Sequence, residues 1–216
     1  EAAVDLLEQA VAVDANRAVA SALHFRMGEV FEHTLGKPGK AAECYGSARS
    51  ADEGHSLAFD AEVRCLCAAG KHKAAVSMLQ EAAVGASNPE DAARLWLESA
   101  VVLERNLGEP LDAIEAYKQA TESSSLQPAA LAAWTALSRA SGDPDAIVDA
   151  LLAASTTLPT TAGRVEAGYT AARMMVDVLG DSARAEAVLT QCMEADPHNP
   201  TVVGLLRLVA VRLARW

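Results

Sequence analysis

Histidine and cysteine are the side chains of this sequence that most readily bind metal ions or act as nucleophiles, and their spacing decides whether they can. None of the five histidines forms an HExxH pair, and none lies with two cysteines at zinc-finger spacing. His72 follows Cys67 by five residues across a turn glycine, and although this geometry does not forbid a metal site, a structural role is the better interpretation. We therefore expect the cysteines to be buried structural thiols, and we expect no metal site.

Carboxylates are numerous, with 29 Asp and Glu residues in the chain. Acid–base catalysis needs two of them held in one pocket with shifted pKa values. Glu29 and Glu32 are three residues apart and share a helix face, where a solvated or groove-facing pair is the better interpretation. The sequence contains neither a GxSxG motif nor a glycine-rich phosphate loop. We expect no catalytic residue, no cofactor and no enzymatic activity.

The composition indicates an all-helical protein. Hydrophobic residues make up 51% of the 216 residues but aromatic residues only 4%, and alanine, the best helix former, is abundant. A net charge of −11 argues against binding to nucleic acid, whose phosphates it repels. No apolar run reaches the roughly 20 residues that cross a bilayer, and no signal-peptide pattern opens the chain. The sequence names no compartment, although it favours the cytoplasm. Its alanine, valine and arginine content hints at a bacterial gene.

Single glycines recur at a regular spacing along the chain. Gly36, Gly108 and Gly180 are 72 residues apart, and with Gly70 and Gly142 between them the steps alternate between 34 and 38 residues. Each glycine lies between two apolar periodic stretches, which is typical of the left-handed residue that ends a helix. Each of them is therefore predicted to form a tight turn between two helices.

Residues that begin helices follow these glycines. Proline, which is accepted in a first helical turn, comes shortly after three of them. Asp143 and either Asp181 or Ser182 are suited to cap a helix. The pattern predicts helices at 2–14, 17–35, 38–51, 54–69, 71–85, 90–107, 110–123, 127–141, 144–156, 161–179, 182–195 and 199–215.

A fixed period of 34 to 38 residues, with two antiparallel helices in each unit, is typical of a helical solenoid. The sequence resembles tetratricopeptide repeats (TPR), in which a large, a small and an aromatic residue precede the turn glycine. Alanine, an aromatic residue and alanine follow the glycine. The matching residues are Met27, Gly28, Phe31, Gly36, Ala41, Tyr45 and Ala48, then Trp96, Ala100, Leu103, Gly108, Ala113, Tyr117 and Ala120, and then Ala172, Met175, Gly180, Ala185, Leu189, Cys192 and Pro197.

The resemblance covers the whole chain and implies a right-handed α-α superhelix as a single domain over 1–216. The predicted division is a half-repeat at 1–15, hairpins at 16–53, 54–87, 88–125, 126–159 and 160–197, and an unpaired end helix at 198–216. We expect the chain to be part of a longer array. One departure is that the 38-residue hairpins carry one extra residue between the small residue and the turn glycine, as between Gly28 and Gly36.

In this family the first helices of successive hairpins line a concave groove that binds peptides, which implies a non-catalytic scaffold for protein–protein interaction. The alternative is a regulatory or sensor segment of a larger enzyme or signalling protein whose activity lies elsewhere. The groove positions carried over by register are Phe25, Glu29, Glu32, Arg64, Leu97, Val101, Glu104, Arg139, Tyr169, Arg173 and Val176. They lack the lysine and asparagine set of the TPR clamps that grip a C-terminal carboxylate, so such a clamp is not expected.

The last stretch, TVVGLLRLVAVRLARW, is apolar nearly all round and carries three arginines. One interpretation is a basic amphipathic helix that lies on a membrane surface. The other, which the repeat spacing favours, is the first helix of a further hairpin. A natural cap has a polar outer face, and this helix does not. We therefore expect an adhesive end and, as a hypothesis, self-association of the isolated chain through it.

Overall fold

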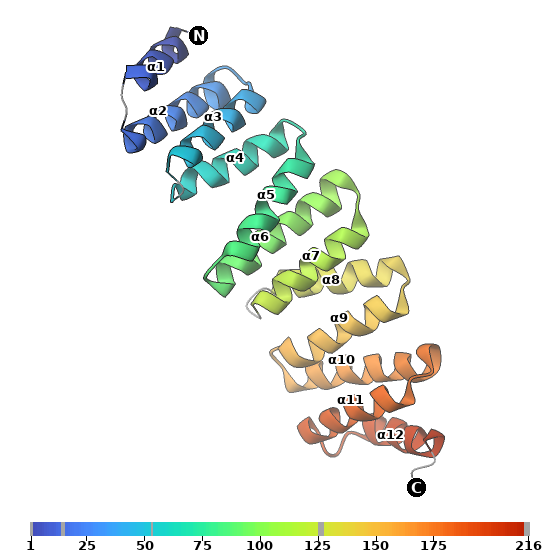
Figure 1. The fold of residues 1–216 in the computed structure, drawn as a ribbon. Helices are drawn as coiled ribbons and strands as arrows, with labels where there is room; N and C mark the ends of the chain where they lie inside the picture. The colour runs from blue at the N-terminus through green and yellow to red at the C-terminus, as the bar shows by residue number, and fades with distance from the viewer. Residues whose placement is uncertain (1, 14–15, 53, 125–127, 214–216) are drawn as a thin grey trace. The chain divides into compact units, whose positions relative to one another are not determined.

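The computed structural model describes residues 2–13, 16–52, 54–124 and 128–213, whose course is shown in Figure 1. Within these ranges the chain forms twelve α-helices and three short π-helices and contains no β-strand, which confirms the all-α prediction. The elements are α1 (Ala2–Val13), α2 (Arg17–Glu29), η1 (Val30–Thr34), α3 (Pro38–Ala51), α4 (Ser56–Ala68), α5 (His72–Gly85), α6 (Pro89–Val102), η2 (Leu103–Leu107), α7 (Pro110–Ser123), α8 (Pro128–Ser141), α9 (Pro144–Thr157), α10 (Thr161–Met174), η3 (Met175–Leu179), α11 (Ser182–Ala195) and α12 (Pro200–Arg212).

The five regularly spaced glycines end helices, as predicted. Their φ angles lie between 60° and 74°, in the left-handed region. A side chain at such a φ costs about 1–2 kcal/mol because its Cβ approaches the following carbonyl oxygen. Glycine is therefore the residue that lets each helix reverse direction within a few residues.

The helices that follow these turns begin as the sequence indicates. Proline occupies the first turn of α3, α7 and α9. At the start of α11 the carboxylate of Asp181 accepts a hydrogen bond from the N–H of Arg184 at 3.0 Å. Of the two candidate caps at this turn, Asp181 and Ser182, the aspartate is the one that caps the helix.

The extra residue of the 38-residue hairpins is accommodated in a π-helix. Each of the three affected first helices ends in a five-residue π-helical segment directly before its turn, namely η1, η2 and η3. A π-helical turn holds one residue more than an α-helical turn. The longer helix can therefore reach the same kind of turn without shifting the residues that pack earlier in it.

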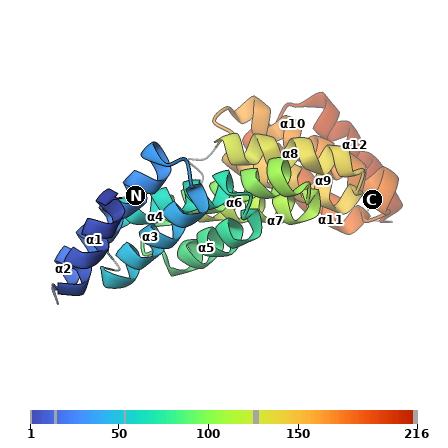
Figure 2. The same cartoon turned by 90° about the horizontal axis from the view of Figure 1, so that it is seen from above.

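One compact unit comprises residues 1–84 together with 101–108. In it α1 packs on α2, α2 on α3 and α3 on α4, and both Figure 1 and Figure 2 show these helices side by side. Tyr45 of α3 is 1% exposed. A Cβ on Gly28 of α2 would come within 2.5 Å of its ring, so the small residue is what allows the two helices to approach closely.

The other compact unit comprises residues 85–100 together with 109–216. From α7 to α12 each helix packs on the next one along the chain. Met175, Leu189, Val202 and Val209 are fully buried in one apolar cluster of this unit, and Tyr117 of α7 is 2% exposed. The helical repeat array is therefore confirmed. The hairpin boundaries and the single domain expected over 1–216 stay predictions.

Candidate functional site

All the residues expected to line a groove lie on first helices of hairpins. Most of them are at least partly exposed, and the exception is described below. They are Phe25 and Glu29 on α2, Glu32 on η1, Arg64 on α4, Leu97 and Val101 on α6, Glu104 on η2, Arg139 on α8, Tyr169 and Arg173 on α10, and Val176 on η3.

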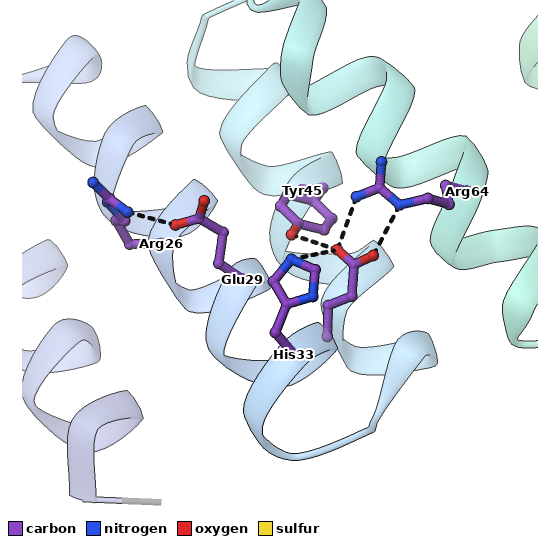
Figure 3. A network of polar contacts seen from close by, with 6 residues as sticks. Arg26, Glu29, His33, Tyr45 and Arg64 are labelled. Atoms are coloured by element: carbon purple, nitrogen blue, oxygen red, sulfur yellow. Dashed lines mark hydrogen bonds and ion pairs between the residues drawn. The ribbon is translucent and has the colours of Figure 1, made fainter.

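Glu32 and Arg64 are brought together in the first unit, although they are 32 residues apart in sequence. The guanidinium of Arg64 donates two hydrogen bonds to the carboxylate of Glu32, from Nε to Oε1 at 2.8 Å and from Nη2 to Oε2 at 2.9 Å. The hydroxyl of Tyr45 donates a third, to Oε2, at 2.8 Å. Figure 3 shows Tyr45 and Arg64 pointing toward this carboxylate from different helices. The arrangement is bidentate and ties two successive hairpins together.

The electrostatics of this network favour a permanently ionised carboxylate. The two hydrogen bonds from Arg64, aided by that from Tyr45, hold the pKa of Glu32 at about 2, well below its usual value of 4.5. Burial, together with the bond to Glu32, raises the pKa of the Tyr45 hydroxyl. A carboxyl group with so low a pKa does not serve as a general acid near neutrality. We therefore interpret the network as a structural one, which stabilises the packing of the two hairpins.

Two other predicted residues of the first unit, Glu29 and Phe25, also have partners close by. Glu29 accepts a hydrogen bond from Nη1 of Arg26 at 2.8 Å on the same helix, and both side chains are labelled in Figure 3. The ring of Phe25 stacks on the ring of His55, with 4.9 Å between the ring centres. These side chains are thus held in defined orientations on the surface of α2.

Val176 is misplaced by the sequence-based prediction. It is 3% exposed and belongs to the apolar cluster of the second unit. Glu32 and Glu104 occupy the equivalent positions of η1 and η2 and stay partly exposed, whereas Val176 is apolar and packs in a cluster that includes Val202 and Val209 of α12. Its side chain is not available to a partner, so we exclude it from the candidate surface.

An open trough of about 490 Å³ lies within the second unit. Its walls come from α8 and α10 and its floor from the C-terminal half of α9 together with Leu158, which directly follows that helix. The volume lies in the range of ligand sites, which are mostly apolar with a few polar groups. The lining residues are Pro128, Leu131, Ala132, Thr135, Ala136, Arg139, Leu151, Ala154, Leu158, Gly163, Glu166, Ala167 and Thr170.

The trough exists because the walls carry small side chains. Ala132 and Ala136 of α8 and Gly163 and Ala167 of α10 are among its lining residues. These residues fill little of the space between the two helices, whereas the leucines of the floor supply apolar surface. Arg139 and Glu166 add one charge of each sign to the lining. Such a surface can take up apolar side chains and bind a polar or charged group beside them.

Of the residues predicted for the groove, Arg139 is the one that lines this trough. On α10 the trough is lined by Glu166, Ala167 and Thr170, whereas Tyr169 packs partly against the apolar cluster. Arg173 lies one turn beyond Thr170, is exposed and pairs with Asp177. The sequence signal that could have indicated the trough is the set of small residues in PAALAAWTA and TAGRVEAGYTA. Their spacing puts the small residues of each stretch on one face of its helix.

Neither a metal centre nor a membrane span is evident in the part of the chain that the structure describes. No group of three or more His, Cys, Asp or Glu side chains is placed to hold an ion there. None of the helices in these ranges is both long and apolar enough to cross a membrane. The surface features in these ranges include the polar network of the first unit, the trough of the second, and an open pocket of about 600 Å³ in the first unit that is lined by residues of α3, α4 and α5.

No protein-family model matches the chain, and no curated protein sequence matches it. Solved structures similar to it include a tetratricopeptide repeat protein from Parabacteroides merdae, at 16% identity over 98% of this chain and 79% of that one, with a TM-score of 0.49. YrrB, described as a TPR protein with an unusual peptide-binding site, is 16% identical over 92% of this chain and 96% of that one, with a TM-score of 0.44. The TPR2AB domain of yeast Sti1, in a complex with pHSP90, is 13% identical over 89% of this chain and 84% of that one, with a TM-score of 0.38. These likenesses assign no role to any residue of this chain.

Proposed function

We propose that this protein is a non-catalytic scaffold that binds a segment of a partner protein in the groove formed by its first helices. The observation that carries the proposal is the trough between α8 and α10, with its apolar floor and small-residue walls. Because the walls are helices packed in a continuous stack, the trough needs no rearrangement to accept a side chain. Peptides and partner helices bind to grooves of this kind through regularly spaced apolar anchors.

The partner segment fits the trough best if it presents apolar side chains with charged groups beside them. The floor leucines, Leu151 and Leu158, favour an apolar anchor. Arg139 and Glu166 favour a partner that carries groups of both signs. The net charge of −11 is consistent with a protein partner and unfavourable for nucleic acid.

A pocket-filling substitution tests the site. Ala136 is exposed and lines the trough, so Ala136→Trp should occupy it without disturbing the core. Ala140→Trp, on the same helix at an exposed position outside the trough, is the matched control. A peptide array would first identify a binding sequence, and fluorescence anisotropy would then compare the variants. We expect Ala136→Trp to weaken binding about tenfold or more, and Ala140→Trp to leave it unchanged.

The wider groove is tested by reversing charges at two of its predicted positions. Glu29→Lys and Arg173→Glu should change which partners the protein captures in a pull-down. If both variants capture the same partners as the unmodified protein, the assignment of Glu29 and Arg173 to the binding groove is contradicted. Equal binding by the Ala136→Trp and Ala140→Trp variants, or an array without any bound peptide, would contradict the assignment of the trough.

The alternative function, a regulatory or sensor segment of a larger enzyme or signalling protein, places the activity outside this chain. It uses the same surface, with the partner segment supplied by the parent protein. The full-length gene distinguishes the two, because a catalytic domain fused to these helices would favour the alternative.

A further inference from the structure

The open pocket of the first unit has no role in the polar network or in the predicted groove. Its volume is about 600 Å³. The lining comes from the C-terminal part of α3, from α4 and from α5, and all of these residues lie within the stretch 1–84. The pocket is therefore formed within a single compact unit.

The pocket uses a different face of α4 from the one that carries Arg64. Phe59, Glu62 and Leu66 line it, and their spacing of three and four residues puts them on one face of the helix. Arg64 comes two residues after Glu62 and binds the carboxylate of Glu32 on η1. Residues two apart do not face the same way on a helix, so the pocket is distinct from the groove expected along the first helices.

One wall of the pocket holds an ion pair between Arg49 of α3 and Glu62 of α4. Nε of Arg49 donates a hydrogen bond to Oε2 of Glu62 at 3.0 Å, and the side chain of Glu62 is 14% exposed. The guanidinium of Arg49 also lies over the ring of Phe59, 6.0 Å from the ring centre, which is at the outer limit of cation–π attraction. The two charges of this wall balance each other.

Glu81 of α5 adds a negative charge that nothing in the lining balances. It is exposed, and within the described ranges no hydrogen bond or ion pair involves its carboxylate. Arg49, Glu62 and Glu81 are the charged residues of the lining, so the pocket carries one positive and two negative charges. The chain as a whole has a net charge of −11. Both the pocket and the whole molecule therefore attract a cation.

The uncharged residues of the lining favour an organic cation over a metal ion. Hard divalent cations need about six oxygen ligands, and the described part of the chain holds no group of three or more candidate ligands. The pocket instead offers the ring of Phe59 and the thioether of Met78, both of which are partly exposed. Such surfaces cover the aliphatic stem of a long basic side chain whose charged end lies in a polar environment.

Of the two long basic side chains, arginine suits this lining better. Ser77 and Glu81 both line the pocket and are four residues apart on α5, so their oxygen atoms lie side by side on one helix face. The guanidinium group is a rigid fork that binds two neighbouring acceptors and stacks on aromatic rings, whereas the lysine ammonium is a compact, strongly hydrated point charge. The pair of acceptors next to Phe59 therefore matches a guanidinium.

We propose that this pocket binds an arginine side chain of a partner protein, with the guanidinium at Glu81 and the stem on Phe59 and Met78. Arginine is among the side chains that most often anchor protein–protein interfaces. The site lies in the first unit and the trough in the second, so the proposal does not rest on the function proposed for the trough.

Titration of the full chain with short synthetic peptides, followed by NMR of its backbone amides, tests the site. The peptides have the sequence Ser-Gly-Ala-Xaa-Ala-Gly-Ser with blocked ends, and Xaa is arginine, lysine, citrulline or glutamate. Citrulline keeps the shape of arginine but carries no charge. We expect the arginine peptide to bind saturably and to shift amides of α4 and α5. The lysine peptide should bind more weakly, and the other two should not bind.

Two pairs of variants assign the binding to the pocket. Glu81→Gln removes the unbalanced charge, and Glu8→Gln, at an exposed position of α1 outside the pocket, makes the same change in net charge. Ser77→Trp fills the pocket without changing its charge, and Leu57→Trp, at a 65% exposed position of α4 outside the pocket, is its control. We expect Glu81→Gln to weaken binding of the arginine peptide about fivefold and Ser77→Trp to abolish it. Both controls should bind as the unmodified chain does.

Several results would overturn the proposal. They are an arginine peptide that does not bind saturably, a lysine or citrulline peptide that binds equally well, and amide shifts confined to the second unit. Equal binding by Glu81→Gln and Glu8→Gln, or by Ser77→Trp and Leu57→Trp, would overturn it as well. The Ala136→Trp variant, in which the trough is filled, should bind the arginine peptide unchanged, so the pocket and the trough are tested separately.

Discussion

Replacing Glu32 by glutamine should destabilise the first unit and reduce its sensitivity to acid. The substitution keeps the shape of the side chain and an oxygen that can accept the hydrogen bond from Tyr45. It removes the negative charge that binds both nitrogens of Arg64. Arg64 is 57% exposed on its side chain, so water solvates the guanidinium that is left without this partner.

The magnitude follows from the pKa of Glu32. A pKa lowered from 4.5 to about 2 corresponds to roughly 3 kcal/mol of preferential stabilisation of the ionised form. Solvent around Arg64 screens part of this, so we expect the variant to lose about 1–2 kcal/mol at pH 7. The pKa of the folded state lies below that of the unfolded state. The contribution of Glu32 is therefore present above about pH 5 and is lost as the pH falls toward 2.

Urea denaturation followed by circular dichroism, at pH 7 and at pH 3, measures both effects. Repeat arrays open segment by segment, so hydrogen exchange of the amides of α2 and α4 at pH 7 locates the loss. Glu29→Gln is the control on the neighbouring turn. It removes an ion pair whose arginine is 72% exposed, and such pairs contribute about 0.3–0.5 kcal/mol.

Two outcomes would refute this reasoning. The first is a Glu32→Gln variant that loses no more stability at pH 7 than the Glu29→Gln variant does. The second is a Glu32→Gln variant whose stability falls as steeply between pH 5 and pH 3 as that of the unmodified protein. Either result would mean that the pair between Glu32 and Arg64 does not hold the two hairpins together.

Three further predictions concern packing and turns. Tyr117→Ala empties a site that is 2% exposed and should lower the free energy of unfolding by about 3–5 kcal/mol; a thermal melt shifted by less than about 1 °C would contradict this. Gly28→Ala drives a methyl group to within 2.5–2.8 Å of the Tyr45 ring and should cost about 1–3 kcal/mol in urea denaturation, whereas a neutral effect would show that the helices are not in close contact. Gly180→Ala, at φ 70°, should lower the free energy of unfolding by about 1–2 kcal/mol and so lower the melting temperature. Gly204→Ala, in open space within α12, should raise the free energy of unfolding by about 0.5–1 kcal/mol and so raise the melting temperature. Shifts of the same sign for the two variants would exclude the backbone conformation as the cause.

Most of the fold follows from local signals in the sequence. A left-handed glycine, a proline in a first turn and an aspartate cap each act over a few residues, so their positions predict where helices end and begin. The sequence also marked Gly28 and Tyr45 as positions of the repeat motif, but it did not indicate that the ring of Tyr45 packs directly against Gly28. The extra residue before Gly36 was also visible, although the π-helix that holds it was not.

The candidate site depended much more on tertiary contacts. Glu32 and Arg64 were both expected on the groove surface, but the sequence did not indicate that they bind each other. The trough was not predicted; of the residues expected in the groove Arg139 is the one that lines it, and Val176, which was expected on a surface, is buried.

The sequence by itself thus determined the helices, their order and their repeat, because helix ends depend on the conformations of a few neighbouring residues. Only the tertiary structure decided which side chains meet across hairpins and where a cavity is left between them. Those features depend on the rotation of each helix about its axis and on the distance to its neighbours. Val176 illustrates this, because Glu32 and Glu104 at the equivalent positions of η1 and η2 stay partly exposed, whereas Val176 is buried in an apolar cluster with residues of α12.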